Sequence, residues 1–598
     1  MLGPDDQPEN QSSETVQFEA PASSLPPPYQ RQGNGLIRNI RWAKGDWRSV
    51  VIANFHARIA SDIILDDGSE QTRRFVLEAN IEGRSLIFEL AANEFGHMGW
   101  VLPHLGPQAI IYPGQQQHVR TAIQFVSGAV PQQRIFSHLG WRNQGGRWIY
   151  LHAGGALGAR ESVDGCQVRL RAPMDLYHLR QPTAGDEQVA AIRASLGLLA
   201  AAPDRISFPL LAAVYRAALG GANFSLFVSG PSGAFKSSLA AVCQQHFGAA
   251  MDAGHLPANF ASTGNALEGL AFAAKDALLV VDDFAPTGVR DDKLDRVAER
   301  LFRAAGNRQG RQRLGGGGRV GEPRPPRALV LATGESVPPG ESIRARILVV
   351  EVGPEDVIPQ LLSESQRAGG QGLLAAAMGG FVTWVAEQYE ELHIRSQVRV
   401  QEIRDSWRRG SRHARTPAAL AELQSGWEIF LRFALEAGAI TKGEQEELTK
   451  RAERALTELS LRQAAYQGAA DPAFRFLASL KTALESGCAH VADRHGRAPD
   501  QAADWGWRGK PKGRGWGPLG ACIGWIAGDD LYLEPAASYE TALRAGNLAV
   551  SQQQLRQRLR ERGLLASVDI GRNMLVVRRT LAGHPRQVLH LRADNFSR

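Results

Sequence analysis

The chain has 598 residues, of which 43% are hydrophobic and 22% charged, and its formal net charge is +7 at pH 7. This length allows three or four domains with substantial cores, and the basic balance is compatible with a polyanionic partner without requiring one. No signal peptide, membrane-spanning stretch, C-x-x-C pair or histidine ligand cluster is visible, which favours a cytoplasmic protein whose four cysteines are reduced core thiols.

In chain order, composition divides the sequence into five segments. Residues 1–34 are rich in Pro, Gln and Ser and are expected to be disordered. Residues 35–181 alternate short β-type runs with Gly and Pro, which predicts a mostly β domain with one helical insert near "VRTAIQFVSG". Residues 182–353 read as an α/β core, residues 354–467 as a helical region and residues 468–598 as a separate C-terminal unit.

The stretch "GPSGAFKSSLA" places Gly230, Lys236 and Ser237 where the phosphate-binding pattern G-x-x-x-x-G-K-[ST] requires them. The apolar run "NFSLFVSG" before it predicts a buried strand, and "KSSLAAVCQQHFG" after it has helical spacing. A strand, a Gly-rich loop and a helix N-terminus would direct backbone N–H groups and a helix dipole at phosphates. The expected ATP-binding residues are Gly230, Pro231, Ser232, Gly233, Ala234, Phe235, Lys236, Ser237 and Ser238.

Phe235 stands where the pattern has its second glycine. We expect this residue to lie in the first turn of the helix, where a non-glycine backbone is tolerated, while Gly233 keeps the loop flexible. The phenyl ring must then point away from the phosphates. The sequence therefore predicts a functional but atypical loop.

The second half of such a site is a carboxylate at the end of another buried strand, which "DALLVVDDF" supplies. Asp282, together with the Ser237 hydroxyl, is expected to hold Mg²⁺, and Asp283 is expected to orient the attacking water. A further apolar run, "RALVLATGE", ends at Thr333, a polar tip suited to the γ-phosphate side. "ESIRARILVVEV" adds Arg344 and Arg346, charges that could complete the site of a neighbouring subunit or form local ion pairs.

The C-terminal unit contains "LAVSQQQLRQRLRERGLL", a helix predicted to start after Ser551 and to bury Leu555 and Leu559. "NMLVVRRTLAGHPRQVLHLR" then reads as two strands around a turn. A helix followed by a basic β-hairpin is the pattern of a winged helix, whose arginines either contact DNA or form an ordinary solvated face. The arginines of the outer helix face are Arg556, Arg558, Arg560 and Arg562.

From about Arg48 onward the chain resembles the domain-of-unknown-function 927 family, helicase-like ATPases of bacterial plasmids and integrative elements. The matching strings include "EFGHMGWVLPHLG", "HLGWRN", "STGNALE", "VVDDF", "LATGES" and "GWIAGDDLYLEP". The resemblance implies a multidomain protein with a P-loop ATPase core of the AAA+ type and a homo-hexameric ring. The chain departs from the family at Phe235, where glycine is usual, and at Asp283, where Glu is commoner.

In ring helicases, the interval between the aspartate strand and the Thr333 strand holds a hairpin that projects into the central channel and grips the nucleic acid. Here that interval is "GNRQGRQRLGGGGRV". Its glycines would allow a mobile tip, and its arginines could contact phosphates without reading base sequence. A solvated surface loop is the alternative. The expected DNA-binding residues are Arg308, Arg311, Arg313 and Arg319.

These features lead to three functional hypotheses. The first is an ATP- and Mg²⁺-dependent DNA helicase or translocase that acts on single-stranded or forked DNA in replication of a mobile element, with replication or loading partners. The second is a nucleotide-switched DNA-binding or loading factor that hydrolyses ATP slowly and does not unwind. The third is a defence ATPase that senses phage replication.

Overall fold

The structure is a computed structural model of the chain and describes residues 27–42, 45–159, 166–286, 292–310, 322–408, 415–510, 515–546, 548, 550–572 and 574–596. Two compact units are present. The first takes in the described residues up to Ile135 except Asp67–Ser69, and the second contains Asp67–Ser69 and the described residues from Phe136 onward. No helix among the described residues has both the length and the apolar character needed to cross a membrane.

The first unit is rich in strands, as the alternating runs predict. Strands β1–β3 form one antiparallel sheet, and β4–β6 form a second in which β7 lies beside β4. A helix covers the predicted insert, and two shorter helices precede it because Phe95, Val101 and Leu105 bury their side chains there. The bounds are β1 (Tyr29–Gln32), β2 (Gly35–Arg41), β3 (Trp47–Ala53), β4 (His56–Asp66), β5 (Gln71–Ile81), β6 (Arg84–Ala91), α1 (Ala92–His97), α2 (Val101–Leu105), α3 (Gln116–Ser127) and β7 (Gln132–Phe136).

The second unit begins with a small antiparallel sheet that packs on its α/β core. The Trp141 indole donates to the Ala218 carbonyl over 2.7 Å, and the Tyr150 hydroxyl donates to the Asp276 carbonyl over 2.6 Å. Both side chains are buried in the same apolar cluster as the core strands, so this sheet belongs to the second unit. The strands of this sheet are β8 (Gly140–Gln144), β9 (Arg147–His152) and β10 (Gly155–Gly158); the short strand β11 (Gln167–Val168) follows in the chain and is not part of it.

The core itself is a five-stranded parallel sheet in the order β13-β14-β15-β12-β16. Its central strands are buried along almost their whole length, which explains their continuous apolar runs. The bounds are α4 (Asp186–Leu196), α5 (Asp204–Ala218), β12 (Ser225–Ser229), α6 (Lys236–Gln245), β13 (Ala258–Asn259), α7 (Gly264–Ala273), β14 (Leu278–Phe284), α8 (Asp292–Asn307), β15 (Leu329–Gly334), α9 (Glu341–Arg344) and β16 (Ile347–Glu351).

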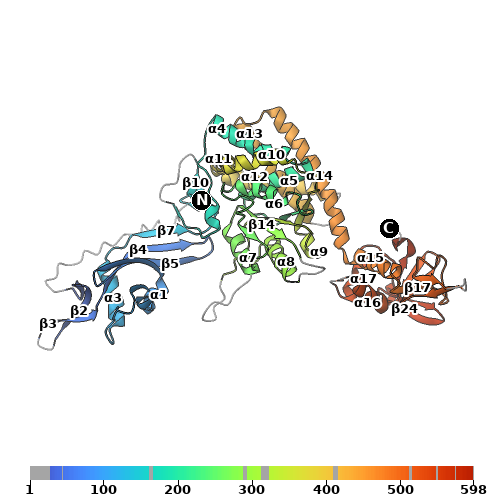
Figure 1. Cartoon of the computed structure of the whole chain (residues 1–598), viewed down its shortest axis with the longest axis horizontal. Helices are drawn as coiled ribbons and strands as arrows, with labels where there is room; N and C mark the ends of the chain where they lie inside the picture. The colour runs from blue at the N-terminus through green and yellow to red at the C-terminus, as the bar shows by residue number, and fades with distance from the viewer. Residues whose placement is uncertain are drawn as a thin grey trace, which may run out of the picture. The chain divides into compact units, whose positions relative to one another are not determined.

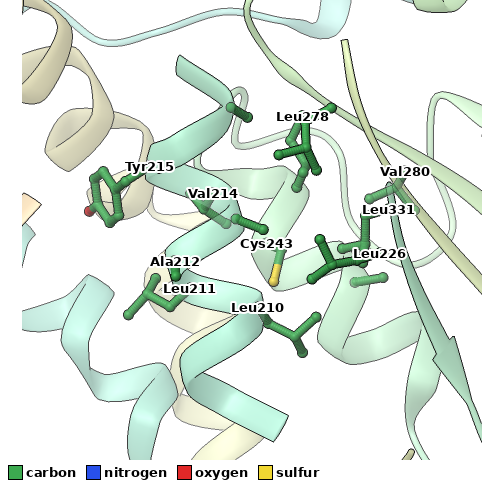
Figure 2. Packing of buried hydrophobic residues seen from close by; sticks show 14 of the residues in the cluster. Leu210, Leu211, Ala212, Val214, Tyr215, Leu226, Cys243, Leu278, Val280 and Leu331 are labelled. Atoms are coloured by element: carbon green, nitrogen blue, oxygen red, sulfur yellow. The ribbon is translucent and has the colours of Figure 1, made fainter. Parts of the chain in front are cut away.

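Apolar side chains from α5 and α6 pack against the sheet in the cluster that Figure 2 shows. Cys243 of α6 lies within this cluster, where burial raises the pKa of its thiol to about 12. All four cysteines are free, as the sequence predicts, but the expectation of core thiols is wrong for Cys488, which is exposed. The labelled residues are Leu210, Leu211, Ala212, Val214, Tyr215, Leu226, Cys243, Leu278, Val280 and Leu331.

Two buried glutamines form hydrogen bonds with backbone groups of the sheet that have no strand partner. These groups lie on β14, whose neighbour β13 has only two residues, and on β16, which is at the edge of the sheet. Gln244 of α6 accepts from the Val280 N–H over 2.8 Å and donates to the Leu278 carbonyl over 3.2 Å. Gln463 accepts from the Val349 N–H over 3.0 Å on the edge strand β16. Each glutamine amide takes the place of a neighbouring strand as the hydrogen-bond partner, so these buried backbone groups are paired without a further strand.

Five long helices follow, as the sequence predicts for the region after the core, and they group with α5 (Figure 1). Helices α13 and α14 both pack on α5. Pro472 ends the last of them, since proline cannot continue a helix, and the buried Asp471 caps the next helix by accepting from the Ala473 N–H. The bounds are α10 (Pro359–Gly370), α11 (Leu373–Ala386), α12 (Tyr389–Trp407), α13 (Arg415–Glu436) and α14 (Lys442–Ala470).

The C-terminal part has its own apolar cluster, built around α15 and a mixed sheet. Helix α17 starts at the predicted cap, where the Ser551 hydroxyl accepts from the Gln554 N–H, and Leu555 and Leu559 are buried as predicted. The predicted pair of strands is present as β23 and β24. The bounds are α15 (Pro472–Glu485), β17 (Ala489–Asp493), β18 (Trp507–Gly509), β19 (Trp516–Pro518), β20 (Ala521–Ala527), β21 (Asp530–Leu533), α16 (Pro535–Ala545), α17 (Gln552–Glu561), β22 (Leu565–Ser567), β23 (Val577–Leu581) and β24 (His584–Arg592).

Candidate nucleotide-binding site

The loop after β12 has the predicted strand–loop–helix geometry. Strand β12 is buried, and α6 begins at Lys236. The Gly230 N–H donates to the Gly334 carbonyl at the end of β15 over 3.3 Å, which ties the start of the loop to the sheet. A Cβ atom on Gly230 would lie 2.2 Å from the Val352 carbonyl oxygen, so only glycine fits there. The first glycine of the motif is therefore required by packing.

Phe235 is the N-cap of α6 and has a left-handed backbone, with φ +58° and ψ +21°. The expectation that Phe235 lies in the first helical turn, with a backbone conformation that suits a non-glycine residue, is therefore wrong. Left-handed backbone is favoured by glycine, because a Cβ atom crowds the following carbonyl and costs about 1–2 kcal/mol. The second glycine of the motif thus has a conformational reason, and this chain adopts the same backbone with a phenylalanine. The ring is 39% exposed and lies outside the core.

Replacing Phe235 by glycine is expected to keep or raise ATP turnover, because the backbone would keep its conformation without the Cβ strain. The stability gain should stay below about 1 kcal/mol, since glycine also increases the entropy of the unfolded chain. Phe235→Ala is the matched control, because it removes the ring but keeps the strained Cβ. Binding of a fluorescent ATP analogue and steady-state hydrolysis are the measurements. A collapse of nucleotide binding in Phe235→Gly, with Phe235→Ala unaffected, would contradict this account.

Lys236 lies over the loop that precedes it. Its ammonium group donates to the Pro231 carbonyl over 2.7 Å. No side chain caps the N-terminus of α6, so the first N–H groups of this ten-residue helix have no side-chain acceptor. Ser237 and Ser238 follow in the first turn and are half-buried. An ammonium group beside an uncapped helix N-terminus is a favourable environment for a phosphate group.

Asp282 and Asp283 lie at an irregularity of β14. The register between β14 and β15 shifts between Val281 and Phe284, and Asp283 has a left-handed backbone with φ +63°. Asp is among the few non-glycine residues that adopt this conformation readily, which gives a physical reason for Asp at this position. Bulges of this kind redirect side chains that a regular strand would send to opposite faces.

Thr333 links the two aspartates. Its hydroxyl donates to the Asp282 carboxylate over 2.5 Å and accepts from the Asp283 N–H over 3.1 Å. The side chain is buried, with 1% of its surface exposed. Thr333 therefore holds both aspartates in place in the structure, a role that its position at a strand end did not indicate.

Strand register brings the loop and the aspartates to one edge of the sheet. Ser229 of β12 and Phe284 of β14 are both level with Gly334 of β15, which lies between them. The carboxyl ends of parallel strands are where α/β proteins bind ligands. The ammonium, the uncapped helix and the two carboxylates thus share the edge at which a nucleotide phosphate chain and a divalent cation would be bound.

The chemistry of these groups fits a magnesium nucleotide. Mg²⁺ is usually held by one or two carboxylates together with substrate phosphates and water, and Asp282, Asp283 and the Ser237 hydroxyl supply oxygen donors of that kind. Among the described residues, no three His, Cys, Asp or Glu side chains group into a site that would hold a metal by itself.

Arg344 and Arg346 make contacts with neutral acceptors inside the chain. Arg344 donates to the Tyr466 carbonyl over 3.2 Å, and burial lowers the pKa of its guanidinium. Arg346 donates to the Asn307 side-chain oxygen over 3.0 Å and to the Ser342 carbonyl over 2.6 Å. Burial, followed by the charge of Arg415, lowers the pKa of Arg346 as well.

Sequence reasoning did not single out Arg415, whose guanidinium donates to the same Asn307 oxygen over 3.2 Å. It lies 415 − 346 = 69 residues beyond Arg346, and no motif connects the two positions. Only the packing of α13 near the end of α8 brings them together. The paired arginines border a small cavity of about 170 Å³ between Phe224, Gly306 and Thr416.

The predicted DNA-binding arginines are only partly described. Arg308 follows α8, and its guanidinium donates to the Ala222 carbonyl over 3.3 Å. Burial, followed by the charge of Arg216, lowers the pKa of Arg308. Arg311, Arg313 and Arg319, together with the glycine run between them, lie outside the described residues.

No protein-family model matches the sequence, and no curated protein matches it. Among solved structures, the chain is similar to one described as the active helicase Cch of SCCmec type IV, with a TM-score of 0.56 and 13% identity over 96% of this chain and 99% of that one. The chain therefore shares a multidomain α/β fold with a helicase. A second match is the C-terminal region of NrS-1, with 10% identity over 66% of this chain and 86% of that one, but its TM-score of 0.21 supports no argument.

Proposed function

We propose that this protein is an ATP-dependent DNA helicase or translocase. The observation that carries the proposal is the meeting of the Lys236 loop and the Asp282–Asp283 pair at one edge of the parallel sheet, with Thr333 between them. A solved helicase with the same fold over nearly the full length of both chains supports it. DNA as the substrate, a core of the AAA+ type and a role in mobile-element replication are parts of this proposal.

In the proposed site, the N–H groups at the start of α6 and the Lys236 ammonium bind the phosphates of ATP. Ser237 and Asp282 hold Mg²⁺, which, when bound, neutralises charge on the phosphate oxygens. Asp283 orients water for attack, and Thr333 fixes the position of both carboxylates through its hydrogen bonds. Each function follows from a group whose place at the sheet edge is described above.

Arg344 and Arg346 are proposed to act in a homo-hexameric ring, where one subunit completes the site of the next. Their present acceptors are a carbonyl, an amide oxygen and a hydroxyl rather than carboxylates. An arginine without an opposing carboxylate keeps its charge available to a phosphate. Replication or loading partners and a cytoplasmic location complete the proposal.

The C-terminal part is proposed to be a winged-helix-like domain. Supporting this, α15, β21, α16 and α17 are followed by the β23–β24 hairpin, and β21 pairs with β24. On the outer helix face, Arg558 pairs with Glu341 over 3.2 Å and Arg562 with the buried Asp471 over 2.5 Å. These ion pairs favour a structural role for those two arginines, so DNA contact by this domain would fall to its other basic residues.

The alternative is a nucleotide-switched DNA-binding or loading factor with slow hydrolysis. Phe235, with its left-handed backbone, and the short Asp283 favour it, because Phe235 departs from the phosphate-loop motif and Asp283 from the Glu that is commoner in the resembled family. The two functions differ on a forked duplex with a labelled strand. The helicase should displace that strand when ATP and Mg²⁺ are present, and Lys236→Ala should not. DNA binding that responds to ATP without any strand displacement would contradict unwinding and support the alternative.

A further inference from the structure

A group of tryptophans and arginines lies exposed on the β1–β3 sheet of the first unit. Trp42 is 51% exposed and Trp47 is 40% exposed. The Arg48 guanidinium stacks 4.7 Å from the centre of the Trp42 ring, and Arg41 is the cross-strand partner of Trp47. We call Arg41, Trp42, Trp47 and Arg48 the Trp–Arg patch.

The patch is unusual for a strand of a folded domain. A half-buried strand alternates buried and exposed side chains, yet Trp47–Val51 are all exposed and only the last two residues of β3 are buried. Strand β3 is at the edge of its sheet, where Tyr112 and Ile111 pair only with its end. Exposed apolar patches mark interaction surfaces, and a free sheet edge can associate with other molecules, so this part of β3 is a candidate binding surface.

The sheet around the patch carries positive charge that few carboxylates offset. Between residues 27 and 53 the described part contains Arg31, Arg38, Arg41 and Arg48 but only one carboxylate, Asp46. None of these arginines forms an ion pair with a described residue, whereas three arginines of the neighbouring strands β4 and β5 do. The pairs there are Arg58–Glu78, Arg73–Asp62 and Arg74–Glu89.

We propose that the Trp–Arg patch binds single-stranded DNA. Unpaired bases would stack on Trp42 and Trp47, and Arg41 and Arg48 would neutralise the phosphates between them. Aromatic rings interleaved with arginines suit a single strand because its bases are free to stack, whereas those of a duplex are already stacked on one another. The binding would tolerate any sequence. This inference rests on the proposed function and adds a DNA-contacting surface outside the ATPase core.

The test uses a fluorescein-labelled oligothymidine of about 30 nucleotides and the full chain without ATP. Fluorescence anisotropy measures the binding. Trp42→Ala and Trp47→Ala should each weaken binding by about 5-fold or more, and the corresponding Phe variants should restore most of it. Arg48→Ala should lower the slope of log K against log salt by about 0.7. Ile87→Ala and Arg84→Ala, exposed positions on β6 of the same unit, are the matched controls and should bind like wild type.

ATP hydrolysis without DNA, measured on the same preparations, separates this inference from the proposed function. Suppose that the wild-type protein hydrolyses ATP and binds the oligomer, and that the tryptophan variants bind it equally well. This result would overturn the inference but not the proposed function, and the patch would then be a candidate surface for a protein partner. Equal weakening in the Ile87→Ala control would also overturn it. Wild-type protein that neither hydrolyses ATP nor binds the oligomer would overturn the proposed function as well.

Discussion

Lys236→Ala is expected to reduce ATP hydrolysis by at least about 100-fold, close to the limit of detection. The ammonium is the positive side chain at the loop, and its removal leaves charge on the phosphate oxygens without compensation as the transition state forms. Its only described hydrogen bond is to the exposed Pro231 carbonyl, so the variant should fold normally. A coupled assay of phosphate release, with a thermal melt of the same protein, provides the measurement.

The matched control for this variant is Lys450→Ala, which removes the same charge from an exposed position on α14 and should hydrolyse ATP at the wild-type rate. If Lys236→Ala retains wild-type turnover while its melting temperature is unchanged, the loop after β12 is not the site of hydrolysis.

Asp283→Asn is expected to leave ATP bound but to lower its hydrolysis by about 100-fold or more, since an amide cannot accept a proton from the attacking water. The substitution is nearly isosteric, and Asn accepts the left-handed backbone of this position as readily as Asp does. The backbone N–H that donates to Thr333 is unchanged. Binding of a labelled ATP analogue and single-turnover hydrolysis would report the two effects separately.

Asp500→Asn, at an exposed position of the C-terminal part, is the control for the loss of one carboxylate. Turnover of Asp283→Asn at the wild-type rate would remove Asp283 from the reaction, whereas a loss of ATP binding would make its function structural.

The local elements of the site could be predicted from the sequence. The buried strand before Gly230, the helix from Lys236 and the apolar strand that ends at Asp282 each have a periodicity that depends only on nearby residues. The same holds for the helix after Ser551, because its cap and its two buried leucines are set within a few residues. The strand-rich first unit and the helical region could likewise be predicted from short patterns of apolar residues.

Tertiary structure decided how these elements combine. The order of the sheet places β15 between the loop strand and the aspartate strand, and only this order lets the Thr333 hydroxyl reach Asp282. The meeting of Arg346 with Arg415 at Asn307 likewise depends on residues far apart in the chain.

The backbone of Phe235 shows most clearly what sequence patterns cannot predict. A sequence pattern records which residue type stands at a position, but φ there depends on how the loop closes between β12 and α6. The closure requires a left-handed residue, and the chain meets it with phenylalanine although glycine would do so without strain. The sequence by itself therefore determined the chemical groups and the local elements of this site. Their register, their hydrogen bonds and the strain at Phe235 were set by long-range packing, which no short stretch of sequence encodes.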